Sequence, residues 1–286
     1  MDASTPLPIA RTVQALRAQV AAWRTGGERV AMVPTMGSLH DGHLSLIRLA
    51  RSHATRVVAS IFVNPTQFAP GEDFDAYPRD EAADAALLAG AACDLLYAPD
   101  AAQMYPQGFS TAVSVSGISA PLDGQARPHH FSGVATVVAK LLIQCAPDAA
   151  VFGEKDYQQL LVIRRMAADL DLPVEIIGAP TARHADGLAM SSRNAYLTSD
   201  QRVIAGKLNG VLAKAAASLR QGEPVAAVEA AGVAALNALG FDAIDYLEVR
   251  RADDLGALGS GPIEAPARVF AAARLGRTRL IDNVAV

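Results

Sequence analysis

The sequence predicts an α/β protein with a doubly wound parallel sheet and a smaller C-terminal α+β cap domain. Three observations support this. Apolar, strand-like runs alternate with helical patterns over the first 180 residues, the most unusual loops follow the ends of those runs, and the character of the chain changes after residue 177. Regular alternation of strands and helices is typical of a parallel sheet with helices on both faces.

The predicted strands of the first domain are short and apolar throughout, as expected for strands buried on both faces. They occupy residues 30–33, 57–63, 94–97, 149–152 and 174–177. Between them, apolar residues recur at helical spacing in 79–89, 134–145 and 157–170. We therefore expect residues 1–180 to form one domain that binds a nucleotide and a small-molecule substrate.

Residues 181–286 form the second predicted domain. It opens with a loop rich in Gly, Pro, Ser and Asn, continues with Ala-rich helical patterns from about 200 to 239, and ends in two or three strands with a turn at 275–277. This order predicts a small α+β unit that packs as a cap.

Composition and charge narrow the class of protein. The chain has 286 residues, is 51% hydrophobic, and breaks its apolar stretches well short of the length that a membrane span needs. Its net charge is −4 and its arginines are scattered, which argues against a nucleic-acid-binding surface. Because no export signal is evident and Cys93 and Cys145 lie in apolar segments as packed thiols, we expect a cytoplasmic protein that acts on small molecules.

The segment PTMGSLHDGH, residues 34–43, joins a Gly-rich turn to a His-x-x-His pair where a strand becomes a helix. The first N–H groups of a helix lack partners within it and its dipole is positive there, so phosphate binds favourably. His40 and His43 would project from one face of that first turn. An accidental surface pair is the alternative. Zinc is a weaker one, because no nearby Cys or further His completes a ligand set.

The segment GEKD, residues 153–156, follows another strand and opens a helix. Gly153 allows close approach of a ligand, Lys155 supplies a mobile cation, and Asp156 could cap the helix or contact a hydroxyl or magnesium. Lysine is notable because only four occur among 25 basic residues. A capped helix with a solvated lysine would look the same. Gln159 lies on the same helix face, where a surface position is its default.

Three further loops carry polar residues. In NPTQF, Gln67 places an amide beside an apolar wall, although the segment alone is only a turn. MSSRN, residues 190–194, offers two hydroxyls and a guanidinium, which suits closure over a triphosphate. The whole segment 186–194 is expected to be too polar and too flexible to be core. An interdomain loop would look similar. In RPHHFSG, His129 and His130 precede a helix; they could contact a phosphate or carboxylate or simply cap the helix, and we favour the structural capping role.

Taken together, these segments resemble the pantothenate synthetase family, ligases that join pantoate to β-alanine using ATP. The resemblance runs from about residue 27 to the C-terminus and rests on motifs in the family's order and approximate spacing: PTMGSLHDGH, SIFVNPTQF, DAYPRD, RPHHFSGV, VFGEKDYQQL, DGLAMSSRN and RLIDN.

The resemblance implies a Rossmann-like domain of the nucleotidylyltransferase superfamily, in which HDGH is the His-x-Gly-His motif and MSSRN is a mobile phosphate loop. It implies that the pantoate carboxylate attacks the α-phosphorus of Mg-ATP to give pantoyl adenylate and pyrophosphate. The β-alanine amine then displaces AMP. ATP with magnesium is a substrate complex, no tightly bound cofactor or protein metal site is expected, and a homodimer is implied.

Residue roles are carried over from the family motifs. Expected catalytic residues are His40, His43, Lys155, Ser191, Ser192 and Arg193. Expected ATP contacts are Pro34, Met36, Gly37, Ser38, Leu39, His40, Asp41, Gly42, His43, Gly153, Glu154, Lys155, Asp156, Ala182, Met190, Ser191, Ser192 and Arg193. Gln67 and Gln159 are expected to hold pantoate, and Gln67 also β-alanine.

Two other functions fit parts of this pattern. A nucleotidylyltransferase acting on another small substrate would share the fold and the histidine pair, but the Gln67 and Gln159 amides suit a small hydroxy acid better. A non-catalytic nucleotide-binding regulator would not need His43, Lys155 and Arg193 together.

Overall fold

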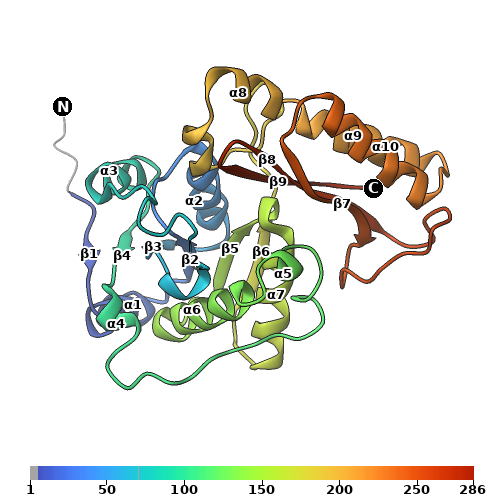
Figure 1. Ribbon diagram of the computed structural model, residues 1–286. Helices are drawn as coiled ribbons and strands as arrows, with labels where there is room; N and C mark the ends of the chain where they lie inside the picture. Colours follow the sequence, from blue (N-terminus) through green and yellow to red (C-terminus); the bar gives the residue numbers. More distant parts are fainter. Residues whose placement is uncertain (1–5, 70) are drawn as a thin grey trace.

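Two β-sheets, each with its own helices, make up the computed structural model, which describes residues 6–69 and 71–286 (Figure 1). The larger sheet has the order β1-β4-β3-β2-β5-β6, and every paired neighbour is parallel. Its strands are β1 (Ile9–Ala10), β2 (Val30–Thr35), β3 (Arg56–Ile61), β4 (Leu95–Tyr97), β5 (Ala149–Gly153) and β6 (Glu175–Ala179). The predicted doubly wound sheet is confirmed, and β1 is an edge strand that the sequence did not predict.

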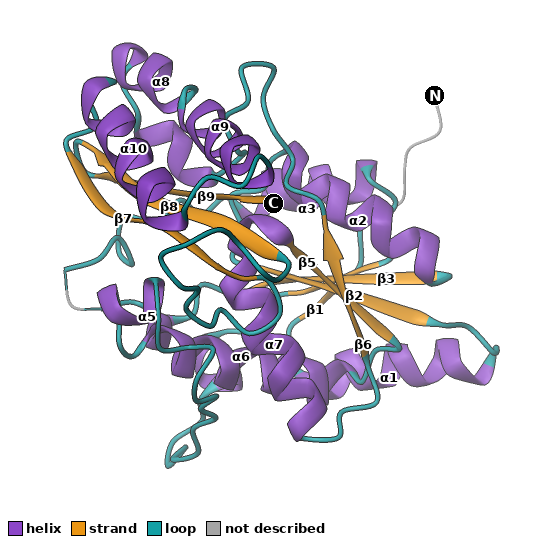
Figure 2. Cartoon of the chain, turned by 90° about the vertical axis from the view of Figure 1, so that its right-hand side faces the viewer, coloured by secondary structure: helices purple, strands orange, loops and turns teal. Residues whose placement is uncertain are grey.

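Helices cover both faces of this sheet, as Figure 2 shows. One face packs against α1 (Val13–Thr25), α6 (His130–Cys145) and α7 (Tyr157–Asp169), and the other against α2 (Asp41–His53) and α3 (Glu81–Gly90). Successive residues of β2 alternate between the two cores: Val30 and Met32 belong to the first, Ala31 and Val33 to the second. Burial on both faces explains why these strands read as unbroken apolar runs.

The strand order reverses direction at β2. From there the chain proceeds outward through β3 and β4 on one side, whereas β5 and β6 lie on the other. In open α/β sheets, loops diverge at such a point and leave a crevice beyond the carboxyl ends of the strands. Here β2 leads into the His-x-Gly-His segment and β5 into GEKD, so the topology brings the two most unusual loops together.

The C-terminal part contains η3 (Ser192–Tyr196), α8 (Ser199–Ala205), α9 (Leu208–Arg220), α10 (Val225–Ala238), and an antiparallel sheet of β7 (Ala243–Arg251), β8 (Ala267–Leu275) and β9 (Thr278–Ala285). The predicted α+β unit and the turn at Gly276 are confirmed. Its core includes Leu212, Leu236 and Val269, but Phe270 packs with the first domain's core against Tyr157. The two units therefore share a packed boundary.

Short elements complete the chain: η1 (Pro65–Gln67), α4 (Ala101–Met104), α5 (Asp123–Ala126) and η2 (Glu154–Asp156). Both cysteines are buried free thiols, as predicted. Within residues 6–69 and 71–286, none of the helices combines the length and apolarity required to cross a bilayer.

Candidate active site

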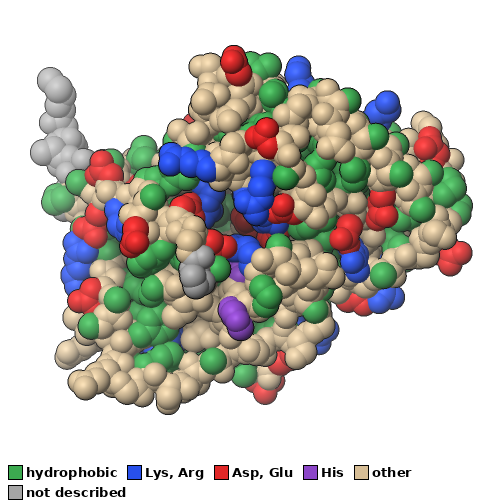
Figure 3. All heavy atoms as spheres, viewed as in Figure 1, with side chains coloured by type: hydrophobic (Ala, Val, Ile, Leu, Met, Phe, Trp, Pro, Cys, Tyr) green, Lys and Arg blue, Asp and Glu red, His purple; other side chains and the backbone are tan. Residues whose placement is uncertain are grey.

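A cavity of about 810 Å³ lies between the two units, at the reversal point of the large sheet. Its volume falls in the range common for small-molecule sites. The ends of β2 and β5 and the start of α2 form one side, and residues of β9 and the 190–194 segment form the other. In Figure 3 the hollow near the centre is bordered by both Lys or Arg and Asp or Glu side chains, so cations able to bind an anionic ligand lie there beside carboxylates.

The two histidines of the motif cap α2 reciprocally. His40 is the N-cap residue, and its Nδ1 accepts from the Gly42 N–H at 3.1 Å, while His43 Nδ1 accepts from the His40 N–H at 3.3 Å. Their rings lie 4.1 Å apart. A Cβ on Gly42 would lie 2.8 Å from His40 Cε1, so the intervening glycine is required for the His40 ring to cover the helix end.

This capping fixes the proton on each ring. Burial, together with the charges of Lys155 and His184, lowers the pKa of His40 to about 4. Burial and neighbouring His40 and Lys155 lower the pKa of His43 to about 3. Both rings are therefore neutral near pH 7, and because each Nδ1 accepts, each Nε2 carries the proton. The motif presents two neutral N–H donors on the first turn of α2.

A buried carboxylate holds the turn that precedes these histidines. Asp84, 3% exposed on α3, accepts from the backbone N–H of Ser38 at 2.8 Å and of Leu39 at 2.7 Å. Ser38 adopts a φ of +53°, and these two hydrogen bonds stabilise that conformation. The N–H groups of Ser38 and Leu39 are thus engaged by Asp84.

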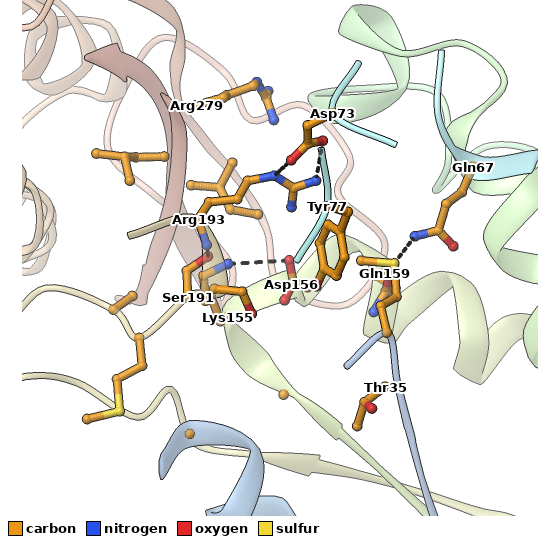
Figure 4. Close-up of a pocket in the computed structure, with 18 of the residues that line it drawn as sticks. Thr35, Gln67, Asp73, Tyr77, Lys155, Asp156, Gln159, Ser191, Arg193 and Arg279 are labelled. Atoms are coloured by element: carbon orange, nitrogen blue, oxygen red, sulfur yellow. Dashed lines mark hydrogen bonds and ion pairs between the residues drawn. The ribbon is translucent and has the colours of Figure 1, made fainter. Parts of the chain in front are cut away.

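Lys155 enters the cavity from η2, immediately beyond β5. Its Nζ lies 3.6 Å from Asp156 Oδ1 (Figure 4). Asp156 occupies the N-cap position of α7, but its side chain makes no capping hydrogen bond. The predicted alternative of a helix capped by Asp156 is therefore wrong, since this carboxylate faces the lysine instead.

Gln67 is oriented by a buried neighbour. Asn64, 1% exposed, donates from Nδ2 to Gln67 Oε1 at 3.1 Å, which leaves the Gln67 NH₂ group directed at Met36 Sδ, 2.9 Å away. A thioether is a weak acceptor. Gln67 Nε2 therefore remains available to a hydroxyl or carboxylate. Gln159 lines the same side of the cavity, as Figure 4 shows.

The RPHHFSG segment supports Gln67 from behind. Arg127 Nη2 donates to the Gln67 carbonyl at 3.2 Å, and His130 Nδ1 lies 3.0 Å from the same oxygen. Arg127 also forms a two-pronged ion pair with Glu72, both contacts at 2.7 Å. Neither His129 nor His130 caps α6 through its side chain, so the predicted capping role is wrong. His130 acts on the Gln67 backbone instead.

The segment that contains MSSRN is docked against the first domain. Ser192 Oγ donates to the Ser38 carbonyl at 2.9 Å, and Arg193 makes two hydrogen bonds of 2.9 Å to Asp73 (Figure 4). Upstream, the Met190 N–H donates to the Ala182 carbonyl, and Leu188 is buried in the cap core. The expectation that residues 186–194 are too polar and too flexible to be core is therefore wrong at Leu188.

The cavity brings together most of the predicted residues. Those that line it are Pro34, Met36, His40, Gly42, His43, Gln67, Gly153, Lys155, Asp156, Gln159, Ala182, Met190, Ser191, Ser192 and Arg193. Absent from its lining are Gly37, Ser38, Leu39, Asp41 and Glu154. The Ser38 and Leu39 amides contact Asp84, and Glu154 pairs with Arg268.

Comparison with known proteins decides the family. Residues 8–285 match the family model of pantoate–β-alanine ligase. The chain belongs to this family. It is 64% identical over 279 residues to a pantothenate synthetase of Caulobacter vibrioides and 59% identical over 280 residues to that of Rhodospirillum rubrum, with at least 97% of both chains covered in each comparison.

Solved structures agree. The structure is similar to a pantothenate synthetase of Thermus thermophilus, with a TM-score of 0.91, 48% identity, and coverage of 97% of this chain and 99% of that one. It is also similar to a pantoate–β-alanine ligase of Francisella tularensis complexed with β,γ-ATP and β-alanine, with a TM-score of 0.82, 34% identity, and coverage of 98% and 97%. As a pantoate–β-alanine ligase, this chain condenses pantoate with β-alanine and uses ATP.

Several residues of this ligase site were not identified from the sequence. Asp73 and Tyr77 come from the loop before α3; Asp73 binds Arg193, whose guanidinium carbon lies 5.7 Å from the Tyr77 ring centre. DAYPRD was noted as a motif, but without a role. Elsewhere in the cavity lining, Asp123 of α5 pairs with Arg279 of β9 at 2.6 Å. For Asp73 and Tyr77, the signal available in the sequence was a loop with acidic and aromatic residues after the end of a strand. For Asp123 and Arg279, no local sequence pattern marked the pair.

The pH dependence of this ligase should reflect its two neutral histidines. Since their folded pKa values lie near 4 and 3, against about 6.5 in the unfolded chain, the neutral donors persist as the pH falls through 6.5. We expect the rate of the ligase reaction to show no histidine inflection between about pH 8 and about pH 5.5. An inflection near pH 6.5 in single-turnover rates would contradict the assignment of both histidines as neutral donors.

The lowered pKa values of His40 and His43 make the stability of the folded protein depend on pH. Between the folded and unfolded pKa values the unfolded state binds more protons, so these histidines leave stability intact above about pH 6.5 and reduce it as the pH falls toward 4. Urea unfolding over this pH range would measure the loss.

Proposed function

We propose that this ligase works through a pantoyl adenylate. A pantoate carboxylate oxygen attacks the α-phosphorus of ATP, a C(O)–O–P bond forms, and pyrophosphate leaves with the electron pair of the broken P–O bond. The β-alanine amine then attacks the acyl carbon, loses a proton, and AMP leaves. Adenylation converts a poor acyl donor into a reactive one, so the protein has chiefly to position reactants and stabilise charge.

One observation carries this proposal: anion-binding donors and neutral amides face each other across a single cavity. His40, His43, Lys155 and Arg193 supply the donors and cations, and Gln67 and Gln159 supply the amides. A covalent nucleophile is not required. Both cysteines lie in the cores, and burial raises the pKa of the Cys145 thiol to about 12.

We assign the phosphate contacts to six residues. The Nε2–H groups of His40 and His43 donate to phosphate oxygens, Lys155 neutralises the charge that develops at the α-phosphate, and Ser191, Ser192 and Arg193 close over the leaving pyrophosphate. The remaining predicted ATP contacts that line the cavity surround the nucleotide. Magnesium would arrive with ATP as part of the substrate complex.

Pantoate is assigned to Gln67 and Gln159. An amide can bind the hydroxyls and carboxylate of pantoate without the charge pairing that an arginine would impose on the attacking oxygen. Gln67 would also contact β-alanine, because the second reactant must approach the acyl carbon from the same region.

Assembly, location and domain limits are part of the proposal. The family resemblance supports a homodimer. Use of ATP and the two free thiols support a cytoplasmic location. We place the domain boundary at 180/181, just beyond the end of β6 at Ala179, giving a first domain of 1–180 and a cap of 181–286.

The decisive experiment is a substrate-omission series with ATP, Mg²⁺, pantoate and β-alanine, with products identified by mass spectrometry. We expect pantothenate, AMP and pyrophosphate only when all are present, and enzyme-bound pantoyl adenylate when β-alanine is omitted. Formation of ADP and phosphate would indicate an acyl-phosphate ligase and overturn the proposal. Transfer of the nucleotidyl group to a stable product would favour a nucleotidylyltransferase instead.

Gly133→Ala is expected to impair pantoate use selectively. A Cβ at Gly133 would lie 2.4 Å from the Thr66 carbonyl oxygen and 2.8 Å from the Gln67 nitrogen, so α6 and η1 must separate. Because Gln67 then shifts, kcat/KM for pantoate should fall about 10-fold or more, with ATP affinity nearly unchanged. Gly210→Ala, where a Cβ meets nothing within 4 Å, is the matched control. Equal losses for both substrates would contradict the assignment of Gln67.

A further inference from the structure

The RLIDN motif of β9 lies directly behind the GEKD loop, although the two are far apart in sequence. Asn283 is 3% exposed, and its Nδ2 donates to the carbonyl oxygens of Glu154 and Lys155, both at 2.9 Å. One side-chain amide of the cap thus satisfies two consecutive carbonyls of the loop that carries Lys155. Both amide protons of Asn283 are used, so the side chain cannot rotate without losing these contacts.

The other end of the same amide is also fixed. Arg268 of β8 donates to Asn283 Oδ1 from Nε and to Glu154 Oε2 from Nη2, the latter at 3.0 Å. Its guanidinium carbon lies 3.9 Å from the Tyr157 ring centre at the start of α7. The oxygen and nitrogen ends of Asn283 are therefore set unambiguously, and Arg268 binds the side chain of the residue before Lys155.

The neighbouring residue, Asp282, fixes the segment that leads into residues 190–194. Asp282, buried like Asn283, forms a two-pronged ion pair with Arg183 at 2.7 and 2.9 Å. Arg183 also donates to the Gly187 carbonyl at 3.0 Å, within the hairpin that leads to Met190. The Asn283 N–H donates to Asp282 Oδ1 at 2.8 Å. Two adjacent side chains of β9 thus fix two separate segments that line the cavity.

We propose that Asn283 is a positioning residue for adenylation, which sets the backbone of the GEKD loop from the cap and thereby aims Lys155 at the reacting phosphate. This inference rests on the proposed role of Lys155. Because Asn283 holds the main-chain carbonyls of Glu154 and Lys155, and Arg268 holds the Glu154 side chain, Lys155 has only its own side-chain torsions to adjust. Displacement of a catalytic group by about 1 Å can cost about 100-fold in rate.

A double-mutant cycle between Asn283 and Lys155 tests the proposal. We expect Asn283→Ala to slow single-turnover formation of pantoyl adenylate about 10- to 100-fold, with the Kd of pantoate changed less than about twofold. In a Lys155→Ala background the same substitution should have less than about a threefold further effect, because the group it positions is gone. Full additivity would show that Asn283 supports folding only and would overturn the inference.

Two further variants guard against ambiguous results. Asn283→Asp keeps the size and the acceptor for Arg268 but has no N–H donors, so it should reproduce the slow adenylation of Asn283→Ala even if the alanine variant folds poorly. Adenylation at the parent rate in Asn283→Asp would overturn the inference. Asn237→Ala, an exposed asparagine on α10, controls for an asparagine lost from the cap and should leave the rate unchanged. If Lys155→Ala alone has no effect, the proposed role of Lys155 fails instead.

Discussion

His43→Asn is expected to slow adenylation by about 100-fold or more while the protein remains folded. Asparagine Oδ1 is attached to Cγ, as is histidine Nδ1, so it can still accept from the His40 N–H and keep the reciprocal cap of α2. What it lacks is the Nε2–H donor. Loss of one preorganised donor to developing charge typically costs about 10²- to 10³-fold, or about 2.7 to 4 kcal/mol of transition-state stabilisation.

Rapid-quench measurement of pantoyl adenylate formation, with urea unfolding in parallel, would check this result. His43→Ala should be as slow and also less stable, because it removes both the donor and the cap. His53→Asn is the matched control, since His53 lies in the last turn of the same helix and does not line the cavity. If His43→Asn retains activity within a few-fold of the parent, His43 serves only as a cap.

Arg193→Lys is expected to slow adenylation by about 100-fold while weakening ATP binding only a few-fold. The guanidinium donates from Nε and Nη2 to the two oxygens of Asp73, an arrangement that also matches a phosphate group. Lysine keeps the charge but loses the planar fork. Because Arg193 is proposed to bind the departing pyrophosphate, its loss should act mainly on the transition state.

Single-turnover kinetics and equilibrium ATP titration separate these two effects, and Arg165→Lys, an exposed arginine on α7, serves as the matched control. Hydrogen exchange across residues 186–194 should slow when ATP binds, because the segment then gains a second set of contacts. An Arg193→Lys variant with unchanged rate and affinity, or exchange that ATP does not alter, would contradict the role of this segment as a lid.

The positions of the strands, and the loops that carry the site, could be predicted from the sequence because each depends on local patterns. The apolar runs of β2, β3 and β5 follow from burial on both faces, and the ligand crevice follows from strand order in parallel sheets. Predictions from isolated residue types were less secure. Asp156 does not cap its helix, and Leu188 is buried in a segment expected to be polar.

By itself, the sequence determined the doubly wound sheet, the α+β cap, and the motif positions of His40, His43, Lys155 and Gln67. Only the tertiary structure decided which groups hold them in place. Three hydrogen-bonded pairs show this: Asp84 with the Ser38 amide, Arg193 with Asp73, and Asn283 with the Glu154 carbonyl. Their partners are separated by 46, 120 and 129 positions in the sequence, respectively. In the sequence, such a carboxylate or amide cannot be distinguished from an ordinary polar residue. Its hydrogen-bond partner depends on how strands and helices that are distant in the sequence pack together.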